Sequence, residues 1–391
     1  VAPGNAGIAR VARTLPVDPS DGAAVAGLAL DEAVDLVVIG PEAPLIAGVA
    51  DAVRERGIPV FGPDRSAARL EGSKAFAKRI MAEAGVPTGA ATDVLTAADL
   101  DAALDAGGAP YVVKADGLAA GKGVLVTEDR GAARAHALAW LERGPVLVEQ
   151  FLAGREVSLF FVSDGERAVP LSPAQDYKRI GNGDTGGNTG GMGAFSPLPW
   201  LDAAFGSEAA FVEHVRAAVA EPVLRRLAAE GSPFVGLLYC GLVVDGTDVR
   251  VIEFNARFGD PETQVVLPRL ATPLSELLTA AASGSLGSAA PPRFAAGAAV
   301  GVVLASEGYP GVPVLGRPIG GIDDADALDG VQVVHAATER VGEALRAAGG
   351  RVLTVVGTGG SVAEARARAY AGVEAIRFPG SLWRTDIAEH E

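Results

Sequence analysis

Residues 252–262 read IEFNARFGDPE, a strand-like stretch that ends in a crowd of polar side chains. Alternate positions are apolar: Ile252, Phe254, Ala256 and Phe258. The positions between them carry an acid, an amide and a guanidinium, which a strand places on one face about 6–7 Å apart: Glu253, Asn255 and Arg257. Val249 and Val251 would share this second face, which therefore begins apolar and becomes polar only at its end.

Two interpretations of this polar face are open. It is either the solvated face of an amphipathic strand or part of a binding site. Glu253 and Asn255 offer two hard oxygen ligands of the kind that Mg²⁺ prefers. Arg257 can hold a carboxylate or a phosphate, and we expect it to reach past the metal ligands toward a substrate. Asp260 and Glu262 follow in a turn that contains Gly and Pro.

The composition excludes several classes of protein. The chain has 391 residues, enough for two or three domains. Its net charge of −15 argues against an electrostatic nucleic-acid binder. Although 49% of the residues are hydrophobic, no apolar run approaches the roughly 18 residues of a membrane span. The single Cys240 lies in the apolar run FVGLLYCGLVV and predicts a buried thiol, with neither a disulfide framework nor a zinc site.

The N-terminus gives two expectations. No signal peptide is visible, so a cytoplasmic protein is predicted. The chain begins VAPGNAG, without a Met or a preceding strand, so we expect further residues to precede Val1.

The chain divides into three predicted domains. Residues 1–68 contain two apolar runs closed by Gly-Pro, DLVVIGP and IPVFGP, with a helical pattern between them. This βαβ pattern predicts an open parallel sheet with ligand-accessible loops at its strand ends. Residues 69–290 change to an α+β pattern rich in hairpins, with a lid at about 90–155. A Pro/Ala/Gly-rich stretch at 283–297 marks the boundary to a small α+β domain at 291–391.

Hairpins and one capped helix are predicted within the middle domain. Three strand pairs joined by Gly-rich or Asp-Gly turns are expected: YVVK with GKGVLVTED, PVLVEQFL with REVSLFFVSDG, and GLLYCGLVVDG with DVRVIEFN. In GSKAFAKRIMAEAGVP, Ser73 is expected to cap a helix that buries Phe76 and Ile80 and stops at Gly85.

The stretch KADGLAAGKGV at 114–124 resembles a P-loop only superficially. Three residues separate Gly117 from Gly121, and Lys122 is followed by Gly123 instead of Ser or Thr. Strands are predicted on both sides, whereas a P-loop needs a strand and then a helix. A glycine-rich hairpin turn can still lay backbone N–H groups over phosphates, with Lys114 and Lys122 neutralising charge. The alternative is a solvated hairpin that carries lysines.

Two further segments carry candidate binding residues. VLVEQFLAGRE at 146–156 offers Glu149 and Glu156, which suit an adenine-ribose site or are two surface acids beside a hairpin. The loop QDYKRIGNGDTGGNTGGMGAFSP at 175–197 is long and glycine-rich, and is either a linker or a substrate cover. Its density of charged and amide side chains favours a substrate-contacting loop: Asp176, Lys178, Arg179, Asp184 and Asn188.

Taken in order, these motifs resemble the ATP-grasp ligases, and among them the glycinamide ribonucleotide synthetase (phosphoribosylamine–glycine ligase) family. The resemblance runs from VAPGNAG through IGPEAPL, FGPDRSAARLEGSKAFAK and VVKADGLAAGKGV to VEQFL, the 175–197 loop, VIEFNARFGDPETQ and GYPG. It covers nearly the whole chain. It implies an ATP-grasp fold with an N-terminal parallel-sheet domain and a small C-terminal α+β domain.

The resemblance also implies site residues by matching position. The phosphates of the nucleotide would be held by Lys74, Lys114 and the 117–123 turn with Gly121 and Lys122. The adenine would meet Glu149 and the backbone of Phe151 and Leu152. The ribose would meet Glu156. The metal, Mg²⁺ or Mn²⁺, would be held by Glu253 and Asn255. The amino acid and the phosphoribosylamine would meet Asp176, Lys178, Asn188, Thr189, Gly190, Gly191, Met192, Arg257 and Asp260. Lys114, Arg257 and Asp176 would be catalytic.

The implied reaction joins glycine to 5-phosphoribosylamine at the expense of ATP. The products are glycinamide ribonucleotide, ADP and phosphate, formed through glycyl phosphate in de novo purine biosynthesis. Small-molecule substrates are expected, without nucleic acid or membrane, in a monomer. Two alternatives stay open: another ATP-grasp ligase or carboxylase, and an ATP-binding protein without complete catalytic machinery.

The chain departs from the family pattern in four places. The initial strand and its GxGGREH turn are absent, so we expect the sugar-phosphate site to be incomplete in this chain. Tyr177 stands where His is common, Gly187 where Pro is common and Ala256 where Cys is common. None of these three has an expected phosphate or metal role.

Overall fold

The structure, a computed structural model, describes residues 1–118 and 123–391. Its N-terminal part contains a parallel pair of short strands, β1 (Val37–Val38) and β2 (Val60–Phe61). Helices α2 (Glu42–Ala47) and α3 (Val49–Arg54) connect them, and α1 (Gly22–Asp31) precedes them. The βαβ arrangement predicted from the two Gly-Pro-terminated runs is confirmed.

Helices α4 (Arg65–Gly72) and α5 (Lys74–Ala84) lead into the middle of the chain. Ser73 is the N-cap of α5, and its hydroxyl accepts a hydrogen bond from the Phe76 N–H. Phe76 and Ile80 are buried, and Gly85 ends the helix with φ +67°. The predicted capped helix is therefore confirmed, and its first residue is Lys74.

We expect replacement of Ser73 by alanine to lower the free energy of unfolding by about 1 kcal/mol, because a first-turn N–H loses its acceptor. The Ser73 hydroxyl also donates to Asp116, so both contacts are lost together. Urea denaturation measures the change, with Ser20→Ala in an exposed turn as the control. Equal stability of the two variants would contradict the capping role.

The next segment forms a four-stranded antiparallel sheet with its own hydrophobic core. Its strand order is β3-β6-β4-β5, and its strands are β3 (Ala91–Val94), β4 (Tyr111–Ala115), β5 (Val124–Thr127) and β6 (Val146–Glu149). Helices α6 (Ala97–Gly107) and α7 (Arg130–Leu141) pack on it through Leu100, Leu104, Ala133 and Ala137. The β4–β5 hairpin predicted from KADGLAAGKGV is confirmed. We call residues 91–149 the β3–β6 unit.

A second four-stranded sheet has the order β14-β13-β7-β8. Its strands are β7 (Arg155–Asp164), β8 (Ala168–Pro170), β13 (Val235–Asp245) and β14 (Asp248–Asn255). The β13–β14 hairpin is confirmed. The predicted hairpin of PVLVEQFL with REVSLFFVSDG is wrong, because β6 pairs with β3 and β4 while β7 pairs with β13 and β8. Both flanks of each strand are thus already occupied, and residues 150–154 carry the chain from one sheet to the other.

A β-bulge at Ile252 corrects the expected faces of β14. Gly241 pairs with Glu253 but Leu242 pairs with Val251, so Ile252 is an extra residue without a partner. An extra residue reverses the alternation of side chains beyond it. Val249 and Val251 consequently share the buried face with Phe254, and do not share the face of Glu253 and Asn255. The expectation that Val249 and Val251 lie on the same face of the strand as Glu253 and Asn255 is therefore wrong.

The C-terminal part is built on a five-stranded sheet of order β17-β20-β15-β12-β9. Its strands are β9 (Gln175–Asp176), β12 (Gly193–Ser196), β15 (Ala298–Ala305), β17 (Val331–His335) and β20 (Arg351–Gly359). Helix α14 (Val362–Ala375) covers it, near α13 (Ile322–Asp326) and a small sheet of β16 (Pro318–Ile319), β18 (Thr338–Val341) and β19 (Ala344–Ala347). Because β9 and β12 belong to the 175–197 loop, that loop joins the C-terminal sheet.

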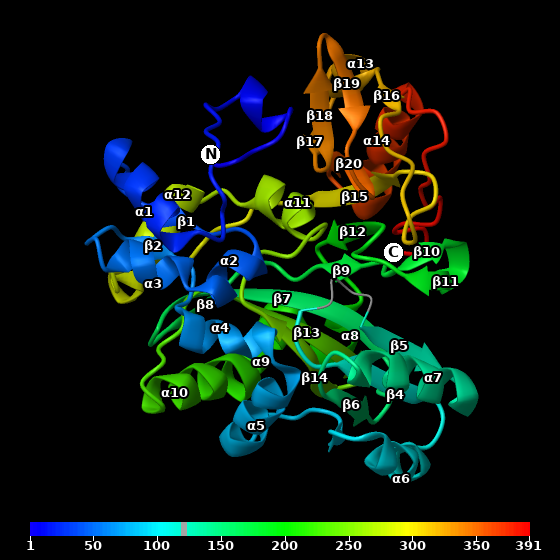
Figure 1. The fold of residues 1–391 in the computed structure, drawn as a ribbon. Coiled ribbons are helices and arrows are strands. Elements are labelled where there is room, and N and C mark those ends of the chain that lie inside the picture. The colour runs from blue at the N-terminus through cyan, green and yellow to red at the C-terminus, as the bar shows by residue number, and fades with distance from the viewer. Residues whose placement is uncertain (119–122) are drawn as a thin grey trace.

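The remaining elements complete the molecule around these sheets. They are β10 (Arg179–Gly181), β11 (Thr185–Asn188), α8 (Leu201–Phe205), α9 (Glu208–Val215), α10 (Glu221–Ala229), α11 (Thr263–Val266) and α12 (Leu274–Ala282). Strands β17–β20 with α13 and α14, which we call the C-terminal unit, lie on the opposite side of the molecule from α5, with β7 and β13 between them (Figure 1). Within the described ranges, no helix is long and apolar enough to cross a membrane.

Candidate active site

Lys114 is a buried lysine whose ammonium group contacts both a carboxylate and a backbone carbonyl of the site. It lies on β4 and is only 4% exposed. Its Nζ is 3.0 Å from Glu149 Oε2 and donates to the carbonyl of Ile252 at 3.2 Å. The bulge at Ile252 therefore connects β14 to the lysine of the other sheet, and the predicted pair Lys114 and Glu149 is in direct contact.

Lys74 approaches the same region from the first turn of α5. Its Nζ donates to the carbonyl of Gly117 at 3.0 Å, at the start of the glycine-rich turn. Gly117 has φ +94°, a conformation that favours glycine. Burial lowers the pKa of Lys74, and the neighbouring Lys114 lowers it further, while Glu253 opposes both. An anion placed between the two lysines would relieve their mutual repulsion. Gly121 and Lys122 lie outside the described residues.

Glu253 and Asn255 present side-chain oxygen atoms toward the lysines from the end of β14. Among the described residues, neither side chain forms a hydrogen bond or an ion pair. Burial alone would raise the pKa of Glu253, but Lys178, Lys114 and Lys74 together lower it, so the carboxylate is ionised. Opposite Glu253, Gly241 leaves space, because a Cβ there would lie 3.1 Å from Glu253 Cγ. The donor set of one carboxylate and one amide fits Mg²⁺ or Mn²⁺, which need a few protein oxygens and accept others from phosphates and water.

Asp176, Lys178 and Glu156 form a second charged cluster. Lys178 Nζ donates to both oxygens of Asp176, at 2.9 and 3.0 Å, and lies 3.1 Å from Glu156 Oε2. A small cavity is lined by Glu156, Lys178, Tyr239 and Glu253 together. The structure thus brings the residue expected at the ribose into contact with residues expected at the amino acid.

Beneath this cluster lies a buried acid that the sequence did not single out as a site residue. Glu262 is 3% exposed, and its Oε1 accepts hydrogen bonds from Ser158 at 3.0 Å and Tyr239 at 2.8 Å. Its position in the FGDPE stretch is the signal that could have identified it. Glu262 fixes Tyr239, which pairs across the sheet with Asn255.

Arg257 does not point freely into the site. Its Nε donates to Glu42 Oε2 at 3.0 Å, its Nη1 donates to the Phe258 carbonyl at 3.0 Å, and its Nη2 lies 3.3 Å from Glu71 Oε1. The second oxygen of Glu71 accepts from the Ala256 N–H at 2.7 Å. Burial raises the pKa of Glu71 to about 7, although Arg257 lowers it. Arg257 therefore links β14 to the N-terminal helices α2 and α4.

The 185–194 loop is fixed against the turn that follows β14. Gly191 has φ +111°, and a Cβ there would lie 2.4 Å from Pro261 Cδ, so only glycine fits. Arg351 donates to the carbonyls of Gly190 and Asp260 at 2.7 and 2.6 Å and pairs with the Asp260 carboxylate at 3.2 Å. No local sequence signal identified Arg351, which comes from β20.

The three other expected substrate residues of the loop, Asn188, Thr189 and Met192, differ in their contacts and their exposure. Thr189 Oγ1 donates to the Lys178 carbonyl at 2.8 Å, which ties the loop to the charged cluster. Asn188 is partly exposed on β11. Met192 is fully buried, so its side chain packs in the core in this conformation.

The segment after β6 has the features expected of an adenine-binding hinge. Phe151 is 42% exposed. Among the described residues, the backbone N–H and C=O groups of Phe151 and Leu152 form no hydrogen bond, although Gln150 N–H donates to the Ala90 carbonyl at 2.8 Å. Free backbone groups beside a carboxylate suit the ring edge of an adenine.

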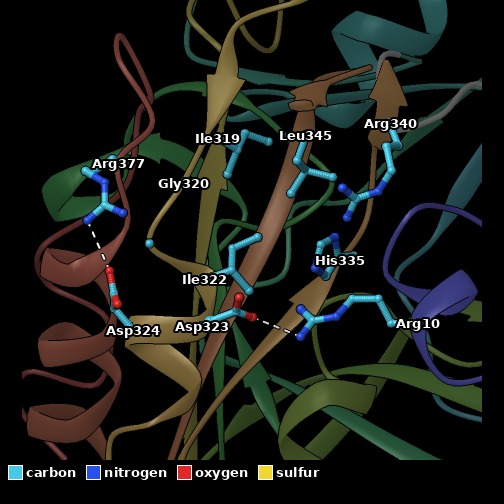
Figure 2. Close-up of a pocket in the computed structure, with 11 residues that line it drawn as sticks. Arg10, Ile319, Gly320, Ile322, Asp323, Asp324, His335, Arg340, Leu345 and Arg377 are labelled. Carbon is cyan, nitrogen blue, oxygen red and sulfur yellow. Dashed lines mark hydrogen bonds and ion pairs between the residues drawn. The ribbon is translucent and has the colours of Figure 1, made fainter. Parts of the chain in front are cut away.

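A cavity of about 320 Å³ lies in another part of the molecule, between the N-terminal segment and the C-terminal unit. Arg10, His335, Arg340 and Arg377 line it (Figure 2). Two of its arginines are already neutralised, because Arg10 pairs with Asp323 at 2.9 Å and Arg377 with Asp324 at 3.1 Å (Figure 2). None of the expected site residues lines this cavity, so its size does not identify the active site.

A lysine on one sheet and a second lysine on the helix beside it, facing a carboxylate and an amide on a second sheet, are the arrangement typical of the ATP-grasp class. The chain belongs to the phosphoribosylglycinamide synthetase family. Three models of that family match it: the N domain at residues 1–71, the ATP-grasp (A) domain at 72–263 and the C domain at 299–390. The resemblance seen in the sequence motifs is thereby confirmed, as is the multidomain ATP-grasp fold.

Relatives in sequence and in structure support the assignment to this family. A relative from Leifsonia xyli subsp. xyli, named phosphoribosylamine–glycine ligase, is 62% identical over 99% of this chain and 92% of its own length. One of the same name from Streptomyces coelicolor is 59% identical over 99% of this chain and 91% of its own length. The crystal structure of phosphoribosylamine–glycine ligase from Thermotoga maritima is 32% identical, with a TM-score of 0.80 over 99% of this chain and 93% of that one. A biotin carboxylase domain from Hydrogenobacter thermophilus, 17% identical with a TM-score of 0.69 over 95% of this chain and 81% of that one, shares the fold.

Proposed function

We propose that this protein is an ATP-dependent ligase that joins glycine to 5-phosphoribosylamine. The products are glycinamide ribonucleotide, ADP and phosphate, in de novo purine biosynthesis. The observation that carries the chemistry is that Lys114 donates to the Ile252 carbonyl beside Glu253 and that both Lys114 and Lys74 lower the pKa of Glu253, whose carboxylate forms no ion pair among the described residues. Family membership supports the choice of substrates, because the relatives at 62% and 59% identity are named phosphoribosylamine–glycine ligase.

The nucleotide site is assigned to residues on both sheets. Lys74 and Lys114 neutralise phosphate charge, and we assign Gly121 and Lys122 of the glycine-rich turn to the same task. Glu149 and the free backbone groups of Phe151 and Leu152 meet the adenine, and Glu156 meets the ribose. Glu253 and Asn255 would hold Mg²⁺ or Mn²⁺. When bound, the ion supplies positive charge that offsets the charge of the phosphates.

The amino-acid and amine side is assigned to the second charged cluster and the loop above it. Asp176 and Lys178 are placed to orient charged groups of substrates, since together they offer a carboxylate and an ammonium beside Glu253. We further assign substrate contacts to Arg257, Asp260 and four loop positions, Asn188, Thr189, Gly190 and Gly191. The Met192 side chain is assigned only to packing beneath that loop.

The proposed mechanism has two steps. The glycine carboxylate attacks the γ-phosphate of ATP, which gives glycyl phosphate and ADP. The amine of phosphoribosylamine then attacks the acyl carbon, forms the amide bond and releases phosphate, with loss of one proton from the amine. Phosphoryl transfer needs positioning and charge neutralisation more than a protein nucleophile, and Lys114 and Lys74 supply the cations, while Arg257, paired with Glu42 and Glu71, positions the end of β14. Exclusion of water protects the acyl phosphate.

A substrate-omission assay tests this function. With ATP, Mg²⁺, glycine and phosphoribosylamine, we expect stoichiometric phosphate and glycinamide ribonucleotide. Omission of glycine should reduce phosphate release to background. Phosphate release with bicarbonate in place of glycine would favour an ATP-grasp carboxylase, and ATP binding without glycine-dependent phosphate release would favour a binding protein.

The proposal extends to the location, the oligomeric state, the binding partners and the domain boundaries of the protein. We propose a cytoplasmic monomer that handles small molecules and neither nucleic acid nor membrane. Its domains would be residues 1–68, 69–290 with the lid at about 90–155, and 291–391.

A further inference from the structure

Lys78 is a buried lysine next to the proposed nucleotide site that none of the assignments above uses. It lies one helical turn after Lys74 on α5, and its side chain is only 14% exposed. Its Nζ donates to Thr88 Oγ1 at 2.9 Å and to the Gly89 carbonyl at 2.9 Å, and it lies 3.2 Å from Glu149 Oε2. All three protons of the ammonium thus have acceptors, which a buried lysine requires.

These three acceptors lie at the two joints of the β3–β6 unit. Thr88 and Gly89 lie just before β3, separated from it by Ala90, and Glu149 is the last residue of β6. The two joints also contact each other, because Gln150 N–H donates to the Ala90 carbonyl and β3 pairs with β6. The unit has its own hydrophobic core, so its placement on the rest of the chain depends on these joints together with the contacts of Lys114 and Asp116.

Lys78 also shares Glu149 with Lys114. Both ammonium groups contact the same oxygen, Glu149 Oε2, at 3.2 and 3.0 Å. When a phosphate attracts Lys114, Lys78 is the charged partner that Glu149 keeps among the residues that the structure describes. A buried carboxylate left without a partner is costly, so Lys78 keeps the Glu149 side chain in place.

We propose that Lys78 is a positioning residue for the nucleotide, which fixes Glu149 and both joints of the β3–β6 unit. This inference rests on the proposed nucleotide site, but ATP binding can be measured without glycine or phosphoribosylamine. Failure of the ligase function and failure of this inference are therefore distinguishable.

The test compares Lys78→Met with Lys78→Arg in the full chain. Because the lost hydrogen bonds are made to a charged ammonium, we expect Lys78→Met to raise the Kd and the KM for ATP roughly tenfold or more. The KM for glycine should change less than about twofold, because the cluster around Lys178 is not touched. Lys78→Arg retains a cation for Glu149 and should recover most of the ATP affinity.

Arg79→Met is the matched control. Arg79 is the next residue on the same helix and pairs with Glu83 and Glu230 on the surface. The Arg79→Met variant loses a positive charge, as Lys78→Met does, but we expect its affinity for ATP to equal that of the wild type. A double mutant of Lys78→Met with Glu149→Gln should bind ATP no more weakly than Glu149→Gln alone, if Lys78 acts through Glu149.

Two results would overturn the proposal. One is wild-type ATP affinity in a folded Lys78→Met variant. The other is an equal rise of the KM values for ATP and glycine together with a lower melting temperature, unrelieved in Lys78→Arg, which would indicate a merely structural lysine.

Discussion

Replacement of Glu253 by alanine should lower the rate of ATP-dependent ligation by roughly 10²–10³, because one preorganised charged partner of the transferring phosphate is lost. Glu253 is ionised between Lys178, Lys114 and Lys74, and no protein group among the described residues uses its oxygens. Its removal takes away the proposed metal ligand and also leaves those lysines in excess. Steady-state phosphate release with saturating glycine and phosphoribosylamine measures the effect.

Glu253→Gln separates the charge from the shape of the side chain. It retains an oxygen ligand and the packing next to Gly241, so a loss of rate of the same order identifies the charge as the cause. Binding of Mn²⁺ in the presence of ADP, followed by electron paramagnetic resonance, should weaken in parallel. Asp248→Asn, at the exposed start of the same strand and paired with Arg250, is the control and should keep the wild-type rate. Near-wild-type turnover of Glu253→Ala would disprove the metal assignment.

Much of this site was predictable because its signals are local. The N-cap at Ser73 and the β4–β5 and β13–β14 hairpins depend on residues that are neighbours in sequence. Alternation along β14 likewise placed Glu253 and Asn255 on one face, and the pairing of the strand keeps them there.

The features that could not be predicted depend on distant partners. The bulge at Ile252 exists only in the register of β14 against β13, so sequence alternation alone assigned Val249 and Val251 to the wrong face. Arg257 is oriented by Glu42, which is 215 positions away. Arg351 reaches Asp260 from a strand of the C-terminal sheet. The connection of β6 to β7 looked like a hairpin because it is short, but other strands occupy both flanks of each.

Glu71 joins the N-terminal helices to the strand that carries the site, and it should make stability depend on pH near neutrality. Its carboxylate is 9% exposed, and burial raises its pKa to about 7 from the ordinary value of 4.5, against the opposing effect of Arg257. Because the pKa of the folded state is the higher one, folding favours the protonated acid. The stabilisation is complete below the unfolded-state pKa and is lost as the pH rises through about 7.

We therefore expect the free energy of unfolding of the wild type, relative to Glu71→Gln, to fall by about 3 kcal/mol between pH 4.5 and pH 8, since one pKa unit corresponds to about 1.4 kcal/mol. Glutamine retains an acceptor for the Ala256 N–H and does not titrate. Urea denaturation of both proteins at several pH values measures the difference. Glu55→Gln, an exposed position at the end of α3, should follow the wild-type curve above pH 6. Parallel curves for the wild type and Glu71→Gln would show that Glu71 titrates as a solvated acid, and that Arg257 and the Ala256 N–H offset the cost of its burial.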